Sequence, residues 1–355
     1  MKILIDIGHP AHVHLFKNFA LEMMAKGNYV LFTVRDKEFE LYLLGINGFK
    51  YKSLGKHYNS IPGKILGLFL FNIKILKTSL SFKPDIFLSH GSVYSAHIAW
   101  LLGKPNITLE DTGNMEQIRL YLPFTSVVLT SDVFHKNLGK KQIRYVGYHE
   151  LAYLHPRRYL GNRFIRKIIR VRENEKFFLL RFISWNASHD KGQKGISIRN
   201  KKELIETLAS FGKVFISSEK KLPQELVKYQ INIPPETMHD VLAEADLFVG
   251  EGATMASECA MLGTPAIYVN SMEAGTINDQ EKNGLLFHFR NFVGVLDKAF
   301  EILNNPNSKI EFKEKRDKIL KDKIDLTAFL IWFVENYPES VRIMKENPEY
   351  QERFK

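Results

Sequence analysis

Short apolar segments typical of buried strands alternate with helix-like segments along the whole chain of 355 residues. The clearest example lies between 245 and 269. An apolar strand at 245–249 meets Gly250, a helix is expected over 256–262, and the next strand begins at 267. Strands that alternate with helices indicate a parallel, doubly wound sheet. The sequence therefore predicts an α/β fold.

The length of the chain favours two domains, because 355 residues exceed one ordinary hydrophobic core. A basic, proline-containing stretch near 155–172 separates two sets of strand–helix units. We expect a Rossmann-like N-terminal domain over 1–157 and a Rossmann-like C-terminal domain over 158–325. The apolar segment at 326–355 is expected to pack back on the first domain.

Ligands of open α/β sheets bind outside the carboxyl ends of the strands. Two such domains are expected to face each other across a cleft. The polar loops at these strand ends are 8–12, 89–92, 110–114, 184–195, 250–255 and 271–280.

The amino-acid composition indicates where in the cell the protein is expected and which partners it is expected to bind. The single cysteine, Cys259, excludes an internal disulfide and fits a reducing cytoplasm. We expect a cytoplasmic protein, since no long uncharged apolar run or signal-peptide layout is present. The net charge of +11 favours polyanions. No nucleic acid partner is expected, because the basic residues do not interleave with aromatic ones.

The segment 61–83 combines apolar residues with four lysines: Lys64, Lys74, Lys77 and Lys83. One interpretation is a buried core helix of the first domain. The other is a surface helix on anionic lipid at the inner membrane face, where lysines add to the affinity.

The turn after Gly250 leads into the N-terminus of a helix, where free backbone N–H groups and the helix dipole suit a phosphate. Glu258 follows about one turn into that helix and could accept hydrogen bonds from ribose hydroxyls. These features together predict a nucleotide-sugar site. The alternative is a glycine-rich turn that only packs tightly.

Other polar residues stand at strand ends. His12 could take a proton from an acceptor hydroxyl, since the pKa of a histidine lies near neutral pH. It could also, like His9, simply cap the following helix. Glu110 and Asp111 end one strand and could both reach the cleft, although one could be a helix cap. No Cys/His cluster has zinc spacing, so neither metal nor cofactor is expected.

The motif Gly252-Ala253-Thr254-Met255-Ala256-Ser257-Glu258 is similar in spacing to Gly-Ala-x-Thr-x-x-Glu of the N-acetylglucosaminyltransferase that makes lipid II. The whole chain resembles that GT-B fold family and, more distantly, the non-hydrolysing UDP-N-acetylglucosamine 2-epimerases. It most nearly resembles an uncharacterised archaeal and bacterial group of unknown function within the same superfamily. The resemblance implies that Glu258 holds the ribose and that the amides of Ala253, Thr254 and Met255 hold the diphosphate.

Three further segments carry the resemblance. Asp279-Gln280 is similar to a pair that contacts the donor sugar, and the loop from Gly8 to Val13 resembles a first glycine-rich loop containing His12. The segment from Leu109 to Asn114 resembles one that faces the acceptor.

Beyond these motifs, the crowded polar loop after the strand at 177–182 is a candidate functional segment, because loops of such length are often functional. The remaining candidates are Arg181, Asn186 and His189 for the nucleotide sugar, and His9, Ser92, Asp111 and Asn114 on the acceptor side.

Two departures from these patterns bear on the reaction. The epimerases place an aspartate where this chain has Ser92, although Glu110 matches an epimerase glutamate. Glu251 stands where these families have serine. It would oppose a diphosphate unless it binds a hydroxyl, an amine or a metal.

The resemblance therefore implies a glycosyltransferase of cell-surface polysaccharide biosynthesis. It would move a sugar from a UDP-linked donor to a glycan or a lipid-linked acceptor, with His12 or Glu110 as the base. The alternatives are a UDP-sugar 2-epimerase and a nucleotide-sugar-binding protein without turnover.

Overall fold

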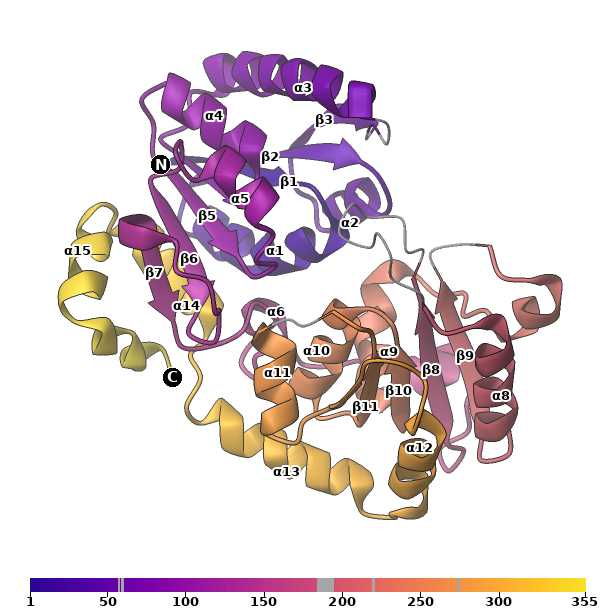
Figure 1. The fold of residues 1–355 in the computed structure, drawn as a ribbon. Coiled ribbons are helices and arrows are strands. Elements are labelled where there is room, and N and C mark those ends of the chain that lie inside the picture. Colours follow the sequence, from indigo (N-terminus) through magenta and orange to yellow (C-terminus); the bar gives the residue numbers. More distant parts are fainter. Residues whose placement is uncertain (57, 59–60, 184–194, 219–220, 273–274) are drawn as a thin grey trace. The chain divides into compact units, whose positions relative to one another are not determined.

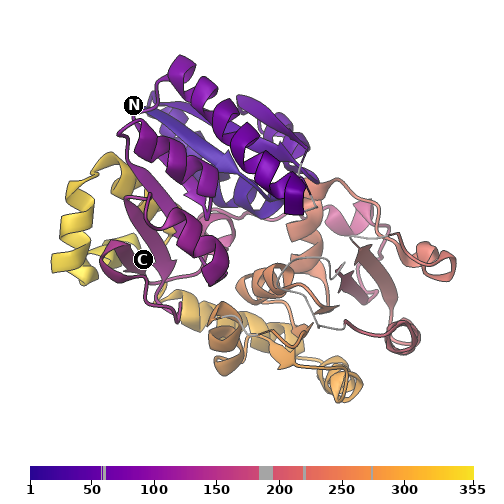
Figure 2. The same cartoon turned by 45° about the horizontal axis from the view of Figure 1, so that its top comes forward.

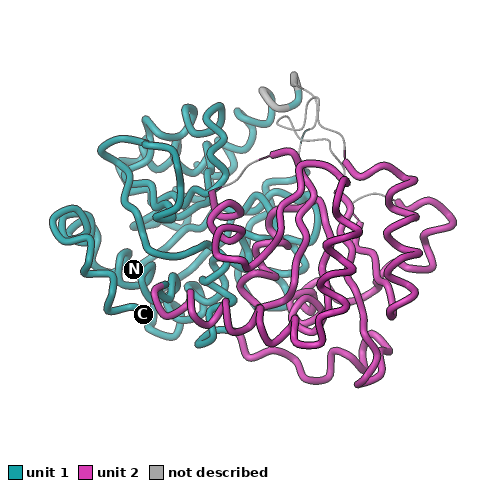
Figure 3. Tube along the Cα trace, turned by 60° about the horizontal axis from the view of Figure 1, so that its bottom comes forward, with its two compact units in different colours: residues 1–158, 323–355 teal, residues 159–322 magenta. Residues whose placement is uncertain are grey.

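The computed structural model describes residues 1–355 except 57, 59–60, 184–194, 219–220 and 273–274 (Figure 1). The chain forms two compact units (Figure 3). Unit 1 comprises residues 1–158 and 323–355, and unit 2 comprises residues 159–322. The C-terminal segment thus belongs to the same unit as the N-terminus.

Unit 1 contains a seven-stranded sheet in the order β3-β2-β1-β4-β5-β6-β7, and every neighbouring pair is parallel. Its central strands are apolar and buried on both faces, as parallel sheets covered by helices require. The strands are β1 (Lys2–Ile7), β2 (Tyr29–Asp36), β3 (Tyr51–Lys56), β4 (Ile86–His90), β5 (Asn106–Glu110), β6 (Val127–Ser131) and β7 (Gln142–Tyr145).

The helices of unit 1 form two packed groups. Helices α3, α4 and α5 lie side by side (Figures 1 and 2), and α1 packs against α2, α6 and α14. Their bounds are α1 (Pro10–Ala25), α2 (Glu40–Ile46), α3 (Ile61–Phe82), α4 (Val93–Leu101), α5 (Met115–Tyr121), α6 (Leu151–Leu154), α14 (Leu326–Glu335) and α15 (Glu339–Glu346). Two 3-10 helices, Gly139–Lys141 and Pro348–Phe354, complete the unit.

The C-terminal segment of unit 1 is held by burial and by an ion-pair network. Phe329 and Phe333 of α14 are fully buried. Arg158 pairs with both Asp325 and Glu22, so one guanidinium joins the two segments that form the unit.

Unit 2 contains a five-stranded parallel sheet in the order β12-β11-β10-β8-β9. The strands are β8 (Phe177–Phe182), β9 (Lys213–Ser218), β10 (Leu247–Gly250), β11 (Ala266–Val269) and β12 (Phe287–Phe289). The helices are α7 (Ile165–Ile168), α8 (Ile198–Ala209), α9 (Met238–Glu244), α10 (Ala253–Leu262), α11 (Gly275–Lys282), α12 (Val295–Asn304) and α13 (Ser308–Leu320), with 3-10 helices at Gln224–Tyr229 and Pro235–Thr237.

The expected α/β class with two parallel sheets is confirmed. The helix expected over 256–262 begins earlier, at Ala253, directly after the N-cap Gly252. It ends as expected at Gly263, whose φ of 72° is the left-handed conformation common after helices. Among the described residues, no helix has both the length and the apolar character that crossing a bilayer requires.

Candidate functional site

The turn between β10 and α10 is shaped by Gly250. A Cβ atom there would lie 2.5 Å from Cζ of Phe248 and 2.9 Å from Cβ of Arg181, so a larger residue would force these neighbours to shift. Gly252 is the N-cap in an extended conformation and has no side chain to cap the helix. The first-turn amides of Ala253, Thr254 and Met255 therefore begin a helix whose positive end lies at the carboxyl end of β10.

Glu258 lies in the second turn of α10 and is only 5% exposed. His239, near the start of α9, donates a hydrogen bond from Nε2 to Oε1 of Glu258 over 3.0 Å. The carboxylate is thus held in position by a side chain of the neighbouring helix α9. Sequence reasoning did not single out His239, because a histidine in a helix gives no signal of its partner.

Helix α11 carries the expected sugar-contacting pair. Gln280 is fully buried, and its amide donates to Oγ of Ser257 on α10 over 2.7 Å. Its carbonyl oxygen is buried without a hydrogen-bond partner among the described residues. Asp279 is half-buried on the same helix. The side chain of Gln280 therefore packs α11 against α10.

Glu251 is fully buried and accepts hydrogen bonds from two backbone amides. Ile183 N–H donates over 3.0 Å and Ile196 N–H over 2.5 Å, while Nζ of Lys201 lies 3.7 Å away. The carboxylate ties together the residues on either side of 184–194, where Asn186 and His189 lie outside the described residues. This role accounts for an acid next to the glycine turn.

Arg181 lies at the end of β8, beside the glycine turn. Its Nη1 donates to Oγ of Ser217 over 2.9 Å, and its Cβ limits the space at Gly250. Arg181 thus packs directly against the turn expected to bind phosphate.

In unit 1, four side chains from separate strand ends lie close together. His12 follows β1, His90 ends β4, Asp111 follows β5 and His149 follows β7. The rings of His12 and His90 are 4.5 Å apart between centroids, and those of His90 and His149 are 5.1 Å apart. His9 is the N-cap of α1 and lies 5.9 Å from His12. The sequence signal for His149 is its position shortly after β7, at the carboxyl end of a strand.

Asp111 bridges two histidines. His90 donates from Nε2 to Oδ1 over 2.9 Å, and Nδ1 of His149 lies 3.0 Å from Oδ2. Burial opposes ionisation of Asp111, but the two histidines outweigh it and hold the pKa of Asp111 well below its usual range. Burial also opposes the charge on His90, yet Asp111 and Glu110 leave the pKa of His90 raised.

His12 has a different environment. Burial, followed by the nearby His90, His9 and Arg35, holds its pKa well below the usual value. Its Nδ1 accepts a hydrogen bond from Gly8 N–H over 3.3 Å. In the neutral ring this places the proton on Nε2.

Glu110 is 1% exposed, and its hydrogen bonds to the described residues all serve the local structure. Oε1 accepts from the amides of Thr112 and Gly113 and from the Thr112 hydroxyl, and Oε2 accepts from the hydroxyl of Tyr121 over 2.7 Å. A carboxylate so occupied shapes the loop after β5. We therefore do not retain Glu110 as a candidate base.

Ser92 and Asn114 are helix N-caps. Ser92 accepts from the amide of Ser95 and donates to the buried Asp6, while Asn114 accepts from the amides of Glu116 and Gln117. Both side chains satisfy first-turn amides, the usual role of these residue types at such positions.

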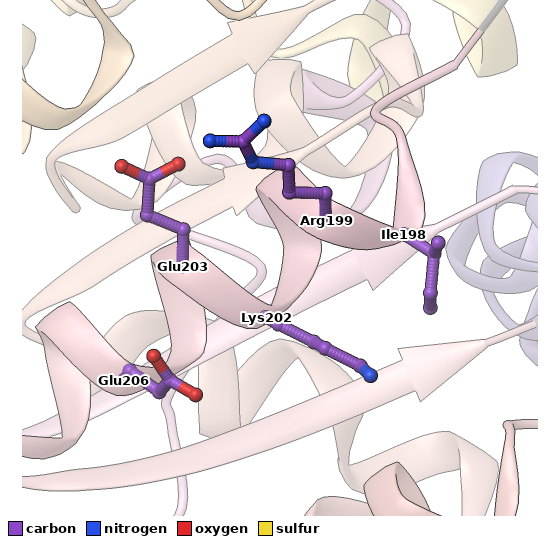
Figure 4. Close-up of a pocket in the computed structure, with 5 residues that line it drawn as sticks. All are labelled: Ile198, Arg199, Lys202, Glu203 and Glu206. Atoms are coloured by element: carbon purple, nitrogen blue, oxygen red, sulfur yellow. The ribbon is translucent and has the colours of Figure 1, made fainter.

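A depression on the surface of α8 is separate from these strand ends. It is lined by the side chains of one helix: Ile198, Arg199, Lys202, Glu203 and Glu206 (Figure 4). Lys202 is paired with Glu225 over 2.8 Å. None of the predicted site residues that the structure describes lines it.

Residues 1–338 match the family described as "Protein of unknown function (DUF354)". The chain belongs to the DUF354 family. It is also 25% identical over 280 residues to the uncharacterized protein MJ0665 of Methanocaldococcus jannaschii, covering 75% of this chain and 81% of that protein.

Solved structures with the same fold include glycosyltransferases and UDP-GlcNAc 2-epimerases. The UDP-GlcNAc 2-epimerase of Neisseria meningitidis, bound to UDP-GlcNAc, has a TM-score of 0.63 at 14% identity, covering 98% of this chain and 99% of that one. S. aureus MnaA with UDP has a TM-score of 0.69 at 12% identity, covering 96% and 97%. The Streptomyces sp. SF2575 glycosyltransferase SsfS6 with thymidine diphosphate has a TM-score of 0.60 at 14% identity, covering 94% and 99%. The DUF354 chain therefore has the GT-B fold.

Proposed function

We propose that this DUF354 protein is a glycosyltransferase that uses a nucleotide-diphosphate sugar, with UDP as the nucleotide. The observation that carries the proposal is the β10–α10 turn, where Gly250 and Gly252 begin a helix without a side-chain cap and Glu258 follows one turn later. The nucleotides bound by structures of the same fold support it: UDP-GlcNAc, UDP and thymidine diphosphate.

In this proposal unit 2 binds the donor. The amides of Ala253, Thr254 and Met255 and the helix dipole stabilise the diphosphate as negative charge develops on the leaving group. Glu258 accepts hydrogen bonds from the ribose. Asp279 and Arg181 are proposed to contact the sugar and the phosphates.

Unit 1 is proposed to activate the acceptor hydroxyl through His12. The lowered pKa of His12 keeps its ring neutral at pH 7, as a base requires. To accept a proton at Nε2 the ring must first move its own proton to Nδ1. That tautomer would point Nδ1–H at Gly8 N–H, which now donates to Nδ1 over 3.3 Å, so the ring must turn away from Gly8 when the tautomer changes.

Two features favour transfer over 2-epimerisation. Ser92 takes the place of the epimerase aspartate and caps α4, and Glu110 has both oxygens occupied by hydrogen bonds. Neither residue offers a spare carboxylate for proton transfer at C2 of a sugar.

The test is incubation with a panel of UDP-sugars and acceptors, followed by mass spectrometry of the products. A glycosylated acceptor with release of UDP supports the proposal. Inversion at C2, or deuterium incorporation at C2 in heavy water, would instead identify an epimerase. Binding of UDP-sugars without any product would identify a binding protein without turnover.

The role of His12 is tested by His12→Ala, with His135→Ala as the control, because His135 is an exposed histidine of the same unit. The proposal expects His12→Ala to lower kcat by about 100-fold or more, the usual contribution of a general base. UDP affinity should stay within about twofold. Loss of UDP affinity with unchanged kcat would remove His12 from this role.

We also propose that the face formed by α3, α4 and α5 contacts anionic lipid. It exposes large apolar side chains on all three helices: Leu66, Phe69, Ile73, Leu80, Trp100, Leu101 and Leu120. Exposed basic residues belong to the same helices or follow them closely in the chain: Lys77, Lys83, Lys104 and Arg119. Lys74, by contrast, donates to the carbonyl of Leu54. Helices that expose both apolar and basic side chains suit a lipid-linked acceptor at an anionic membrane.

Co-sedimentation with phosphatidylglycerol vesicles tests this surface. Binding should be strong at low salt, weaker at high salt, and lost in the double variant Phe69→Ser/Ile73→Ser. Leu160→Ser is the control, because Leu160 is 95% exposed but belongs to unit 2. Equal binding to neutral vesicles, or no effect of the double variant, would refute the contact.

A further inference from the structure

Three potential metal ligands from three strand ends of unit 1 converge on one point. One donor atom each of His90, Asp111 and His149 lies within 4.8 Å of the other two. The sheet order places β4, β5, β6 and β7 side by side, so the loops after β4, β5 and β7 meet at its carboxyl edge. The residues lie far apart in the sequence, which is why the spacing of the histidines predicted no metal site.

The donor set is one carboxylate shared by two imidazoles. Each oxygen of Asp111 faces a different ring nitrogen, at 2.9 Å and 3.0 Å. His149 is only 7% exposed, and its other nitrogen, Nε2, is buried without a hydrogen-bond partner among the described residues. The ring of His149 therefore makes its polar contact through Nδ1, which faces Asp111.

The cluster is both held in place and open to solution. The side chain of His90 is 10% exposed and that of His149 is 8% exposed, so the two rings are fixed by their surroundings. The side chain of Asp111 is 34% exposed, which leaves a path for an ion. A fixed pair of nitrogens with one accessible carboxylate is a suitable geometry for capturing a cation.

We propose that His90, Asp111 and His149 bind a divalent transition-metal ion of the zinc class. Zinc takes histidine nitrogen at about 2.0–2.1 Å and carboxylate oxygen at about 2.0–2.2 Å. Tetrahedral donors at those lengths lie roughly 3.3 Å apart. The pairs now at 2.9 Å and 3.0 Å need to separate by a few tenths of an ångström, and any donors that lie as far as 4.8 Å apart need to approach each other.

Three protein ligands leave one coordination position for water or substrate, as in catalytic rather than structural zinc sites. The ring of His12 stands beside that of His90, with 4.5 Å between centroids. An ion at this point would polarise a bound hydroxyl or phosphate oxygen. Binding needs His90 Nε2 and His149 Nδ1 without their protons, so the affinity should fall in acid.

The experiment uses the full-length, untagged protein after removal of metal with a chelator. Cobalt(II) is added as a spectroscopic probe, and zinc affinity is measured by competition with a chromophoric chelator. The expected result is one equivalent of cobalt with a visible absorption band, and displacement of that band by one equivalent of zinc. Asp111→Asn and His149→Ala should each weaken zinc binding by at least about 100-fold, since even outer-shell changes cost about 10–100-fold.

His135→Ala is the matched control, because it removes an exposed histidine of the same unit. It should leave both the band and the zinc affinity unchanged. Circular dichroism checks the fold of each variant, and His90→Gln serves if His149→Ala does not fold. Absence of the band in the wild type, or its persistence in Asp111→Asn and His90→Gln, overturns the proposal.

UDP binding is measured in parallel and separates this proposal from the proposed function. A protein that binds one zinc but no UDP contradicts the glycosyltransferase assignment alone. A protein that binds UDP but no zinc contradicts the metal site alone.

Discussion

Glu110 and Asp111 are neighbours in the chain but differ in their surroundings. Glu110 is the last residue of β5 and lies inside the unit, where four hydrogen bonds bind its carboxylate. Asp111 follows the strand and is half-buried between His90 and His149. The strand end separates a carboxylate that shapes a loop from one that pairs with two histidines.

At the same scale, we predict that Glu258→Gln weakens UDP binding by about 1–3 kcal/mol, the cost of removing a partner from a buried hydrogen bond. Glutamine keeps the size of the side chain and an oxygen for His239 but loses the charge that favours ribose hydroxyls. Calorimetry with UDP measures the change. The control is Glu206→Gln on α8, where the side chain is exposed. Unchanged affinity in a folded Glu258→Gln protein would exclude this residue from the ribose site.

The neighbouring residues His12 and His90 are expected to have pKa values shifted in opposite directions. An ordinary histidine is half protonated near pH 6.5. Burial, then His90, His9 and Arg35, lowers the pKa of His12, so His12 should be mostly neutral at that pH. Burial opposes the charge on His90, but Asp111 leaves its pKa raised, so His90 should be mostly protonated. Long-range nitrogen–proton spectra of ¹⁵N-histidine-labelled protein would show both states, assigned with His12→Gln and His90→Gln.

These shifts also set the sign of the stability effects. The unfolded chain protonates His12 more readily than the folded protein, so this residue makes folding less favourable as pH falls below about 6.5. His90 has the opposite effect on stability, because its pKa is raised in the folded protein. The stabilisation that protonated His90 contributes is present below about pH 6.5 and is lost as the pH rises through the pKa of His90 in the folded protein. If both rings titrate together at pH 6.5, the environments described for them are wrong.

At the scale of elements, the β10–α10 turn depends on two glycines for different reasons. A Cβ on Gly250 would overlap Phe248 and Arg181, whereas a Cβ on Gly252 would meet only ordinary contacts, the nearest at 3.5 Å. Gly252 also has a φ of −95°, which any residue adopts. Close packing within unit 2 favours glycine at position 250. At position 252 the close approach of a ligand would be the reason for a glycine.

We predict that Gly250→Ala destabilises unit 2 by about 1–3 kcal/mol, the usual cost of overpacking. Gly252→Ala should change the stability by less than about 1 kcal/mol, because it alters only the N-cap. Hydrogen exchange of the amides in β10 and α10 measures both. Equal protection in the two variants would show that the turn is not tightly packed at Gly250.

At the scale of the whole molecule, unit 1 is completed by a segment that lies at the other end of the chain. Thr327 donates to the carbonyl of Ala152 over 2.8 Å, and the amide of Ile324 donates to the carbonyl of Val146 over 3.0 Å. Phe329 is fully buried among aromatic rings, including Phe333 and Phe354 at centroid distances of 5.6 Å and 5.8 Å. The N-terminal sheet therefore depends on C-terminal residues for part of its core.

We predict that Phe329→Ala lowers the stability of unit 1 by about 3–5 kcal/mol, as the loss of a buried aromatic ring does. Urea unfolding followed by circular dichroism measures the loss, and hydrogen exchange in α1 and α14 locates it. Phe39→Ala is the control, because Phe39 belongs to the same unit but is 54% exposed. A loss below about 1 kcal/mol would mean that α14 is not part of the core.

The sequence by itself determined the α/β class, the glycine turn before α10 and the polar residues at strand ends, because these depend on local periodicity and on glycine. It could not show that Glu110, Ser92 and Asn114 hold local structure, since a motif does not reveal which hydrogen bonds a side chain makes. Only the tertiary structure brought His149 to Asp111 and His239 to Glu258. Those pairs depend on the order of parallel strands and on helix packing, which join residues that no local pattern connects.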